Sequence, residues 1–482
     1  MTYHSHLTII EATATRSPRR SAFKLPQLDI GDETPHQKII GWRDITYGKF
    51  HRDIVWCASY WVKKLQSPHG SVVGLWMSGL VYRDFVNLFG LMKAGFVPQI
   101  LNVKIPSIEV AKEYFKQSNI TNIIYAPIAP ADQLKNDFHV HALIDPPLET
   151  YEIPDIDIPP SSKEEHEDDI VLFFHTSGST SGRPKLVPYT RKWIDGHSKK
   201  LLPGLLNGKE IGIGINGIVH LSQFGRAELV QIITECKANA LYQLTPIFGR
   251  VLREAMKNDD LRVALKSLNF VAYGGSAFGD NERFWAIENG IPLKNIYGTT
   301  EFGIAMVSEN DPTILHPIKL PGILHEFISQ ESETEVESKE PRNRHMELVI
   351  SPSSIDRPHR SLCGPDGRYH TKDLFEEVEP NGFVYRGRLD DIIKMSKVGS
   401  GKPSPVLLAE PLDEKMDIKL LKEKIGKKAE LINEDGFPHE RIRRTDVLII
   451  PSGALPRTPK GNINRSTAER LFQREIDAFF DE

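Results

Sequence analysis

Apolar residues recur along this chain at two different spacings, and each spacing predicts a different element. Between residues 50 and 65 they fall three or four positions apart, which predicts a helix with one buried face. Short continuous apolar runs at 71–77 and 99–103 predict buried strands instead, and a helical spacing over 85–94 lies between them. Strands that alternate with helices are typical of α/β proteins, so we expect helices layered around a mainly parallel sheet.

The same two spacings continue through the rest of the chain. They predict helices over 190–202, 229–236 and 247–256, and strands over 240–242, 268–273, 346–350 and 369–375. Asn381-Gly382 is a hairpin turn signal, which places 375–378 and 383–385 in antiparallel strands. The stretch that follows this hairpin is rich in lysine, and we therefore expect a large domain over 1–389 and a small domain over 390–482.

One stretch joins a strand to a loop of small and hydroxyl-bearing residues. The apolar run 171–174 is followed by H-T-S-G-S-T-S-G-R-P-K, which ends at Lys185. Such a loop suits phosphate, because small residues let the backbone approach an anion and bare N–H groups and hydroxyls point at it. Lys185 would add positive charge. Gly178 and Gly182 stand too close together for a Walker A loop, and a flexible polar turn is the alternative.

Length and charge narrow the class of protein. At 482 residues the chain exceeds the usual size of one domain, which indicates two or more. Its net charge of −4 supplies no overall field for nucleic acid or an anionic membrane, so we expect neither as a partner. The longest apolar run, 72–82, is too short to span a bilayer, and residues 1–21 lack the apolar core of a signal peptide. The three cysteines are widely separated and form neither a disulfide framework nor a pair at metal-ligand spacing; they are Cys57, Cys236 and Cys363. We expect a cytoplasmic protein.

A glycine pattern at 212–217 matches G-x-G-x-x-G, which would suggest a dinucleotide oxidoreductase. The pattern is itself apolar and alternating, as in a strand, and no strand–turn–helix context surrounds it. We therefore discount this function.

Three motifs stand in order along the chain: T-S-G-S-T-S-G-R-P-K at 176–185, Y-G-T-T-E at 297–301, and H-T-K-D-L at 370–374 followed by G-R-L-D-D at 387–391. Together they resemble the adenylate-forming superfamily of acyl-CoA synthetases, luciferases and nonribosomal peptide synthetase adenylation domains. The wording is most similar to the adenylation domain of fungal carboxylic acid reductases of the synthetase-like kind. The resemblance implies a large adenylation domain of layered sheets and helices and a small α+β domain, here shortened.

The resemblance also implies a two-step reaction. A carboxylic acid and MgATP would give acyl-AMP and pyrophosphate, and the acyl group would then pass to a thiol of coenzyme A or of phosphopantetheine on a separate carrier protein. Because two anions must meet in the first step, charge has to be neutralised and the reactants held in line. The cofactors implied are ATP, Mg²⁺ and the thiol acceptor, and fungal secondary metabolism is the expected setting.

Most of the implied site residues would hold the nucleotide. The β- and γ-phosphates would lie against the first loop, whose residues are Thr176, Ser177, Gly178, Ser179, Thr180 and Lys185. Glu301 would hold Mg²⁺, a hard cation that prefers carboxylate oxygen, and Thr300 would touch the α-phosphate. Tyr297 would stack on adenine, beside Gly298 and Thr299 of the same motif.

The ribose and the acid have their own implied residues. Asp373 would accept hydrogen bonds from both ribose hydroxyls with Arg388 in support, although any such pair is by default a surface ion pair. The adenine and acyl pockets would be lined by Gly274, Gly275 and Ser276, unless these form an ordinary turn. His220 would lie beside the carboxylate, and both His220 and Tyr297 have a plain core residue as their alternative.

Two departures from the family pattern affect the expected activity. The last motif normally ends in Gly-Lys, but here Lys460 precedes Gly461 and Asn462 follows it, so we expect Lys460 to bridge the carboxylate and the α-phosphate. The family continues after Asp390 with a hairpin and a helix, and here a strand or two and a helix are absent, which indicates either a compact variant or a gene model with skipped exons. Because that hairpin normally enters the active site for thioester formation, we expect this step to be more at risk than adenylation. No acidic residue follows His220 to pair with an ammonium group, so we expect an aryl or short aliphatic acid rather than an α-amino acid. The alternatives are a stand-alone acyl-CoA ligase and a catalytically impaired nucleotide-binding relic.

Overall fold

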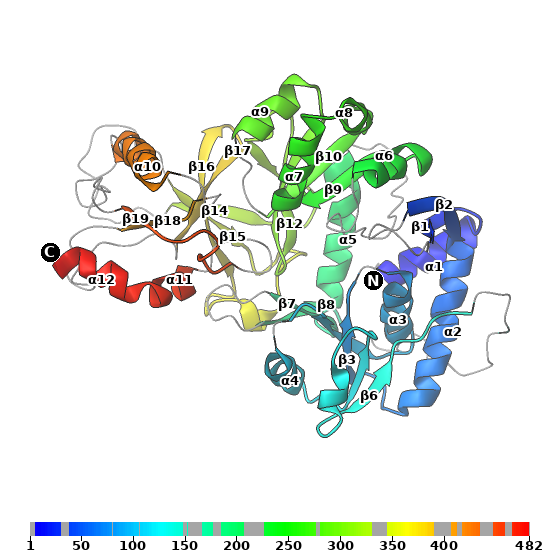
Figure 1. The fold of residues 1–482 in the computed structure, drawn as a ribbon. Coiled ribbons are helices and arrows are strands. Elements are labelled where there is room, and N and C mark those ends of the chain that lie inside the picture. The colour runs from blue at the N-terminus through cyan, green and yellow to red at the C-terminus, as the bar shows by residue number, and fades with distance from the viewer. Residues whose placement is uncertain are drawn as a thin grey trace. The chain divides into compact units, whose positions relative to one another are not determined.

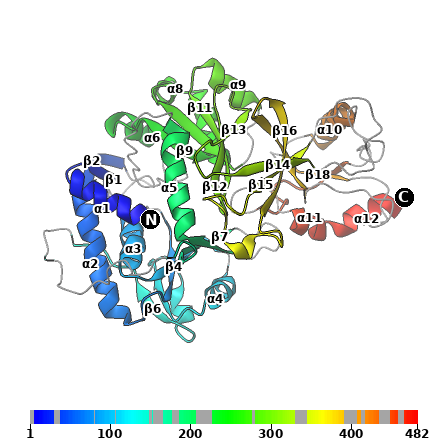
Figure 2. The same cartoon turned by 180° about the vertical axis from the view of Figure 1, so that it is seen from behind.

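A computed structural model describes most of the chain, namely residues 5–29, 38–79, 81–105, 107–147, 152, 166–176, 185–206, 226–275, 280–329, 345–389, 406–411, 417–433, 447–457 and 465–481. The chain divides into two compact units, one of residues 1–175 with 186–389 and one of residues 176–185 with 390–482. Figures 1 and 2 show the elements from two opposite sides.

The first unit contains two large sheets and most of the helices. Its helices are α1 (His6–Arg16), α2 (Tyr47–Leu65), α3 (Tyr82–Lys93), α4 (Ile108–Lys116), α5 (Arg191–Leu206), α6 (Arg226–Glu235), α7 (Thr245–Ala255), α8 (Asp259–Lys266) and α9 (Asp280–Glu288), with short 3-10 turns η1 (Ala131–Leu134) and η3 (Arg360–Leu362). A separate antiparallel hairpin is formed by β1 (Ser21–Asp29) and β2 (Lys38–Thr46).

The smaller of the two sheets has six strands in the order β6-β5-β3-β4-β7-β8. They are β3 (Val72–Met77), β4 (Val97–Asn102), β5 (Asn122–Tyr125), β6 (His139–Ala142), β7 (Ile170–Thr176) and β8 (Lys185–Thr190). Successive side chains of β3 enter different cores: Leu75 packs with α2 and α3, and Trp76 packs with α4. Helices therefore cover both faces of this sheet (Figure 1), as in the predicted α/β layering.

The larger sheet has nine strands in the order β14-β15-β16-β17-β13-β12-β11-β10-β9. They are β9 (Ala240–Leu244), β10 (Phe270–Gly274), β11 (Leu293–Thr299), β12 (Gly303–Ser308), β13 (Leu315–Pro317), β14 (His325–Ser329), β15 (Met346–Ile350), β16 (Tyr369–Glu379) and β17 (Gly382–Arg388). Only β9, β10 and β11 run parallel, and the remaining pairs are antiparallel. The expectation of a mainly parallel sheet therefore holds for the six-stranded sheet and is wrong for this one, where hairpins connect most of the strands.

Several predicted elements are confirmed with small changes at their ends. The helix predicted over 50–65 is α2, and the strands predicted over 71–77 and 99–103 are β3 and β4. The turn signal at Asn381 is the tip of the β16–β17 hairpin, where Asn381 has φ 59°. Local patterns were sufficient here because each element carries its own apolar period.

The second unit contains β18 (Leu407–Ala409) and β19 (Val447–Ile449), which pair in parallel, and the helices α10 (Ile418–Asn433), α11 (Arg465–Leu471) and α12 (Gln473–Asp481). Ile450, Leu455, Ala468 and Phe472 form its small core. Among the residues described above, none of the helices is both long and apolar enough to cross a membrane.

Candidate active site

The open end of the β16–β17 hairpin brings two of the predicted site residues together. Asp373 of β16 lies directly opposite Arg388 of β17 in the strand register. The Nη1 atom of Arg388 lies 3.3 Å from Asp373 Oδ1. The side chain of Asp373 is 6% exposed and that of Arg388 is 39% exposed. A carboxylate this deeply buried is unlike an ordinary surface pair, in which both partners are solvated.

A third predicted residue reaches the same carboxylate from another strand. The hydroxyl of Tyr297, on β11, donates a hydrogen bond of 2.5 Å to Asp373 Oδ2, and the hydroxyl of Tyr385 lies 3.4 Å from Oδ1. Burial, and after it the negative charge of Asp373, hold the pKa of Tyr297 well above its usual range. The phenol therefore stays protonated and donates at neutral pH.

The ring of Tyr297 is part of an aromatic cluster rather than free on the surface. It meets Phe375 edge-on at 4.9 Å between ring centroids and lies 6.2 Å from the ring of Tyr385. Phe302 is a further neighbour at 6.1 Å. The ring of Tyr297 is thus packed as in a core residue, as the alternative proposed. Its hydroxyl, in contrast, is one of the donors that surround the Asp373 carboxylate.

The turn between β11 and β12 carries Thr300 and Glu301. Tyr189, at the end of β8, donates its hydroxyl to the carbonyl of Thr300 at 2.6 Å, and the N–H of Glu301 donates to Thr299 Oγ1 at 3.2 Å. Gly303 closes the turn with φ +71°, a conformation that a side chain disfavours. Among the described residues, no hydrogen bond or ion pair reaches the Glu301 carboxylate. A carboxylate of this kind suits a hard cation that takes one protein oxygen beside phosphate oxygens.

Tyr369 lies near residues of both motifs. Burial, and then the charges of Glu301 and Asp373, raise the pKa of the Tyr369 phenol. Its ring centroid lies 5.8 Å from that of Phe302, the residue after Glu301. The structure therefore brings the predicted magnesium and ribose carboxylates to the surroundings of the same tyrosine.

A buried lysine that the motifs do not include supports this turn. The ammonium of Lys200, on α5, donates to the carbonyls of Phe302 at 2.8 Å and Ile304 at 2.7 Å, and to Asp356 Oδ2 at 2.7 Å. Both charged side chains are fully buried, and His325 Nε2 lies 2.8 Å from the same carboxylate oxygen. Burial alone would raise the pKa of Asp356, but His325 and Lys200 outweigh it and lower that pKa.

Sequence reasoning did not identify Lys200 or Tyr189. One signal existed for the lysine: it stands at helical spacing from Trp193 and His197, on a face that is otherwise aromatic. No comparable signal marks Asp356, because Lys200 and His325 lie far away in the chain and only the folded protein brings them to its carboxylate.

The glycines predicted to line the pockets lie where β10 ends. A side chain at Gly274 would meet the carbonyl of Ile296 on β11, and Gly275 has φ +93°. Gly298 is similarly close to Gly303 across the β11–β12 pair. Backbone conformation or close backbone contact explains why glycine occupies these positions. An ordinary turn is therefore sufficient to explain them, and their role in lining a pocket stays a prediction.

The remaining predicted residues are only partly described. The strand predicted over 171–174 is confirmed as β7, which ends at Thr176, and Lys185 begins β8. Outside the described residues lie Ser177, Gly178, Ser179, Thr180, His220, Ser276 and Lys460. Their predicted roles therefore stay predictions.

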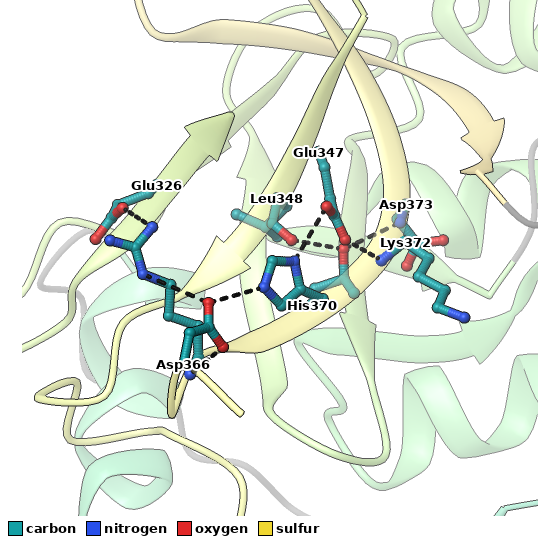
Figure 3. Close-up of polar contacts among 9 residues, drawn as sticks. Glu326, Glu347, Leu348, Asp366, His370, Lys372 and Asp373 are labelled. Carbon is teal, nitrogen blue, oxygen red and sulfur yellow. Dashed lines mark hydrogen bonds and ion pairs between the residues drawn. The ribbon is translucent and has the colours of Figure 1, made fainter. Parts of the chain in front are cut away.

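The polar set around Asp373 continues along β16 (Figure 3). Thr371 Oγ1 donates to the carbonyl of Leu348 at 2.7 Å and accepts the N–H of Asp373 at 3.0 Å. Glu347 of β15 accepts the N–H of Lys372 at 2.9 Å. Main-chain and side-chain bonds thus fix the backbone on which Asp373 stands.

Comparison with known proteins identifies two segments of the chain. Residues 10–194 match the family described as AMP-binding enzyme, and residues 388–482 match the AMP-binding enzyme C-terminal domain. A curated relative, the AMP-binding domain-containing enzyme iboA of Amanita muscaria, is 27% identical over 94% of this chain and 98% of its own length. The adenylate-forming reductase stbB of Stachybotrys bisbyi is 27% identical over 45% of this chain, and that match spans 23% of the reductase.

Solved structures agree on the fold. The adenylation domain of a carboxylic acid reductase from Segniliparus rugosus, in complex with AMP and a co-purified carboxylic acid, superposes with a TM-score of 0.69. Its sequence is 13% identical, and the match covers 99% of this chain and 94% of that one. The anthranilate CoA ligase AuaEII, in complex with anthranoyl-AMP, gives a TM-score of 0.69 at 16% identity and covers 97% of both chains.

Proposed function

This chain belongs to the adenylate-forming, AMP-binding enzyme family, and from that premise we propose that it activates a carboxylic acid with ATP. In the first step a carboxylate oxygen of the acid bonds to the α-phosphorus of ATP. The bond between that phosphorus and the oxygen bridging to the β-phosphate breaks, and pyrophosphate leaves with the electron pair. In the second step a thiol sulfur attacks the acyl carbon, AMP leaves, and the thiol proton is released.

One observation carries the proposal: Asp373 is buried, yet it is reached by hydroxyl and guanidinium donors from Tyr297, Tyr385 and Arg388. Vicinal hydroxyls of a ribose are donors of the same kind and would take the acceptor positions of this carboxylate. The turn that presents Glu301 lies four residues after Tyr297 in the chain. This proximity supports a single nucleotide held at both its sugar and its phosphates.

The remaining roles follow the sequence. Glu301 would hold Mg²⁺, which would neutralise phosphate charge as the two anions approach. Thr300 would contact the α-phosphate and Tyr297 the adenine. The phosphates would also lie against the 176–185 loop, with Lys185 adding charge, and Gly274 and Gly275 would border the base. Lys460 would bridge the two reacting groups, and His220 would lie beside the carboxylate.

For the acid itself we propose an aryl or short aliphatic carboxylic acid without an α-amino group. The residues that follow His220 are Leu221, Ser222, Gln223 and Phe224, and none carries a carboxylate that could form an ion pair with an ammonium group. The superposable ligase was solved with anthranoyl-AMP, an aryl acyl-adenylate, which supports the aryl choice.

For the thiol acceptor we propose phosphopantetheine on a separate carrier protein or coenzyme A. A CoA ligase and the A-PCP didomain of a carboxylic acid reductase are both among the solved structures that superpose on this chain, so both acceptors have support. The fungal origin of the curated relatives supports a place in fungal secondary metabolism, and the cytoplasm is the compartment that we expect.

The test is acid-dependent exchange of labelled pyrophosphate into ATP, run across a panel of aryl, aliphatic and α-amino acids. We expect exchange with at least one acid that lacks an α-amino group, and its loss in Lys460→Ala and Lys185→Ala. Preference for an α-amino acid would overturn the substrate proposal. Nucleotide binding without exchange on any acid would favour the relic, for which Asn462 in place of the usual lysine is the supporting observation. Acyl transfer to coenzyme A in the same reaction would identify a stand-alone ligase.

A further inference from the structure

The strand that carries Asp373 is interrupted by a bulge. In the register of β15 and β16, Val349 pairs with His370 and Glu347 pairs with Leu374. The single residue Leu348 therefore lies opposite three residues of β16, which are Thr371, Lys372 and Asp373. Bulges of this kind change the direction in which a side chain points, and here the side chain concerned is the carboxylate of Asp373.

The centre of the bulge is held in an uncommon conformation. Lys372 has φ 60°, in the left-handed region that residues with a side chain rarely adopt. Such a conformation is strained and persists only where surrounding contacts impose it. One such contact is a hydrogen bond of 2.9 Å from the N–H of Lys372 to Glu347 Oε1.

Glu347 is unusual for a residue in the middle of a core strand. Its side chain is 5% exposed, and the neighbouring Leu348, Val349 and Ile350 are fully buried. A buried carboxylate is costly unless hydrogen bonds and opposite charge compensate it. Its second oxygen lies 3.2 Å from His370 Nδ1, so the carboxylate joins the two residues that flank Thr371 (Figure 3).

Thr371 completes the support from the other side. Its hydroxyl donates to the carbonyl of Leu348 and accepts the N–H of Asp373, so the backbone on both sides of Lys372 is tied to β15. None of these bonds involves an atom that the proposed reaction uses. Their common effect is on the orientation of Asp373.

We propose that Glu347 is a positioning residue for nucleotide recognition: its carboxylate holds the bulge at Thr371–Asp373 so that Asp373 faces the ribose hydroxyls. This inference rests on the proposed function, since it takes Asp373 as the ribose acceptor. The consequence is specific. Loss of the Glu347 carboxylate impairs discrimination between nucleotides with and without ribose hydroxyls, and it does so more than it impairs the fold.

The experiment is calorimetric titration of the full chain with AMP and with 2′,3′-dideoxyAMP, which needs no catalysis. For wild type we expect tighter binding of AMP. For Glu347→Ala we expect the ratio of the two affinities to fall by about 10-fold or more, the range typical of residues that orient a binding group. For Glu347→Gln we expect the ratio to be retained, because the amide oxygen can still accept the N–H of Lys372.

Two further variants separate positioning from folding. Glu347→Asp keeps the charge but withdraws the carboxylate by one methylene, and we expect an intermediate ratio even if Glu347→Ala fails to fold. Glu326→Ala is the matched control: Glu326 pairs with Arg368 at 3.1 Å, and within the described part of the chain its side chain makes no hydrogen bond or ion pair with Thr371, Lys372 or Asp373, so the ratio should equal that of wild type. Thermal melting of each variant measures the folding contribution.

The outcomes are distinguishable. If wild type prefers AMP while Glu347→Ala and Glu347→Asp keep the same preference, the positioning role is overturned and the proposed function stands. If wild type binds both nucleotides equally, the ribose role of Asp373 is wrong, and this inference fails with it. Loss of preference in Glu326→Ala would also overturn the proposal, because the effect would not be specific to Glu347.

Discussion

The hydroxyl of Tyr297 donates to the carboxylate of Asp373 over 2.5 Å, although the two residues stand 76 positions apart in the chain. This bond links β11 to β16, two strands that are not neighbours in the nine-stranded sheet. The bond therefore connects the Y-G-T-T-E motif to the H-T-K-D-L motif, although the two motifs lie on different strands of the sheet.

Removing this hydroxyl should weaken the fold. Tyr297→Phe leaves the ring in its aromatic cluster but deprives the buried Asp373 of a donor, and we expect the free energy of unfolding to fall by about 1.5–3 kcal/mol, as for hydrogen bonds to charged groups. Urea unfolding measures the difference. Tyr60→Phe is the control, because Tyr60 of α2 is 38% exposed. Equal effects of the two substitutions would contradict a structural role for the hydroxyl.

Glu301 should affect the metal-dependent step and not the binding of AMP. Glu301→Gln preserves size but removes the charge that would hold Mg²⁺, so we expect acid-dependent pyrophosphate exchange to fall by about 100-fold. AMP affinity should stay close to that of wild type, since AMP carries no β- or γ-phosphate.

The comparison for this variant is Glu309→Gln, an exposed carboxylate just beyond β12. Its exchange rate should match wild type at every Mg²⁺ concentration. Unchanged exchange in Glu301→Gln would exclude Glu301 as the metal ligand.

The buried pair of Lys200 and Asp356 should be required for stability. Lys200→Met leaves the Asp356 carboxylate buried with His325 and Ser354 as hydrogen-bond partners, and breaking a buried pair on one side typically costs about 3–5 kcal/mol. Denaturant unfolding is the measurement. Lys199→Met removes the neighbouring lysine, whose side chain is 51% exposed and pairs with Asp195, and should cost less than about 1 kcal/mol. If the two variants were equally stable, the buried pair would have no special role.

His370 should make stability depend on pH. Burial opposes the charged form of His370, but the carboxylates of Asp366 and Glu347 outweigh burial and raise the pKa of His370 above its usual value. The nearby cation is Arg368, which lies beside Asp366. A group whose pKa is raised in the folded state stabilises the protein fully below its unfolded pKa, about 6.5, and this stability is lost as pH rises through the folded pKa.

We therefore expect His370→Asn to destabilise the protein more at about pH 6 than at about pH 9, by at most about 1 kcal/mol because water screens a half-exposed side chain. Urea unfolding at the two pH values gives the difference. The exposed His345, which immediately precedes β15, provides the comparison variant His345→Asn. A larger effect of His370→Asn at the higher pH would contradict the sign.

Much of the fold was predictable from the sequence because the relevant signals are local. The apolar period of α2 lies entirely within its own 19 residues, and the hairpin that pairs Asp373 with Arg388 is signalled by Asn381 and Gly382 at its tip. Motif order, read through the resemblance to the adenylate-forming superfamily, likewise selected Tyr297, Glu301 and Asp373 as candidate site residues, and the structure places Tyr297 against Asp373.

The support of the site was not predictable, because it depends on distant partners. Lys200 and Asp356 stand 156 positions apart, and Glu347 and Lys372 stand 25 apart across a bulged register. Whether a lysine or glutamate is buried depends on the residues that surround it in the folded protein. The spacing of apolar residues along the sequence does not contain that information. The positive φ of Lys372 was equally hidden, since such a conformation is expected of glycine or asparagine.

We expect Asp373 and Glu301 to hold the two ends of one ATP molecule, and a crystal structure of the protein with Mg²⁺ and a non-hydrolysable ATP analogue would show whether they do. The ribose hydroxyls should lie within hydrogen-bonding distance of the Asp373 carboxylate, and a magnesium ion should be bound to Glu301 and to phosphate oxygens. A nucleotide whose sugar points away from Asp373, or whose magnesium ion does not contact Glu301, would contradict it.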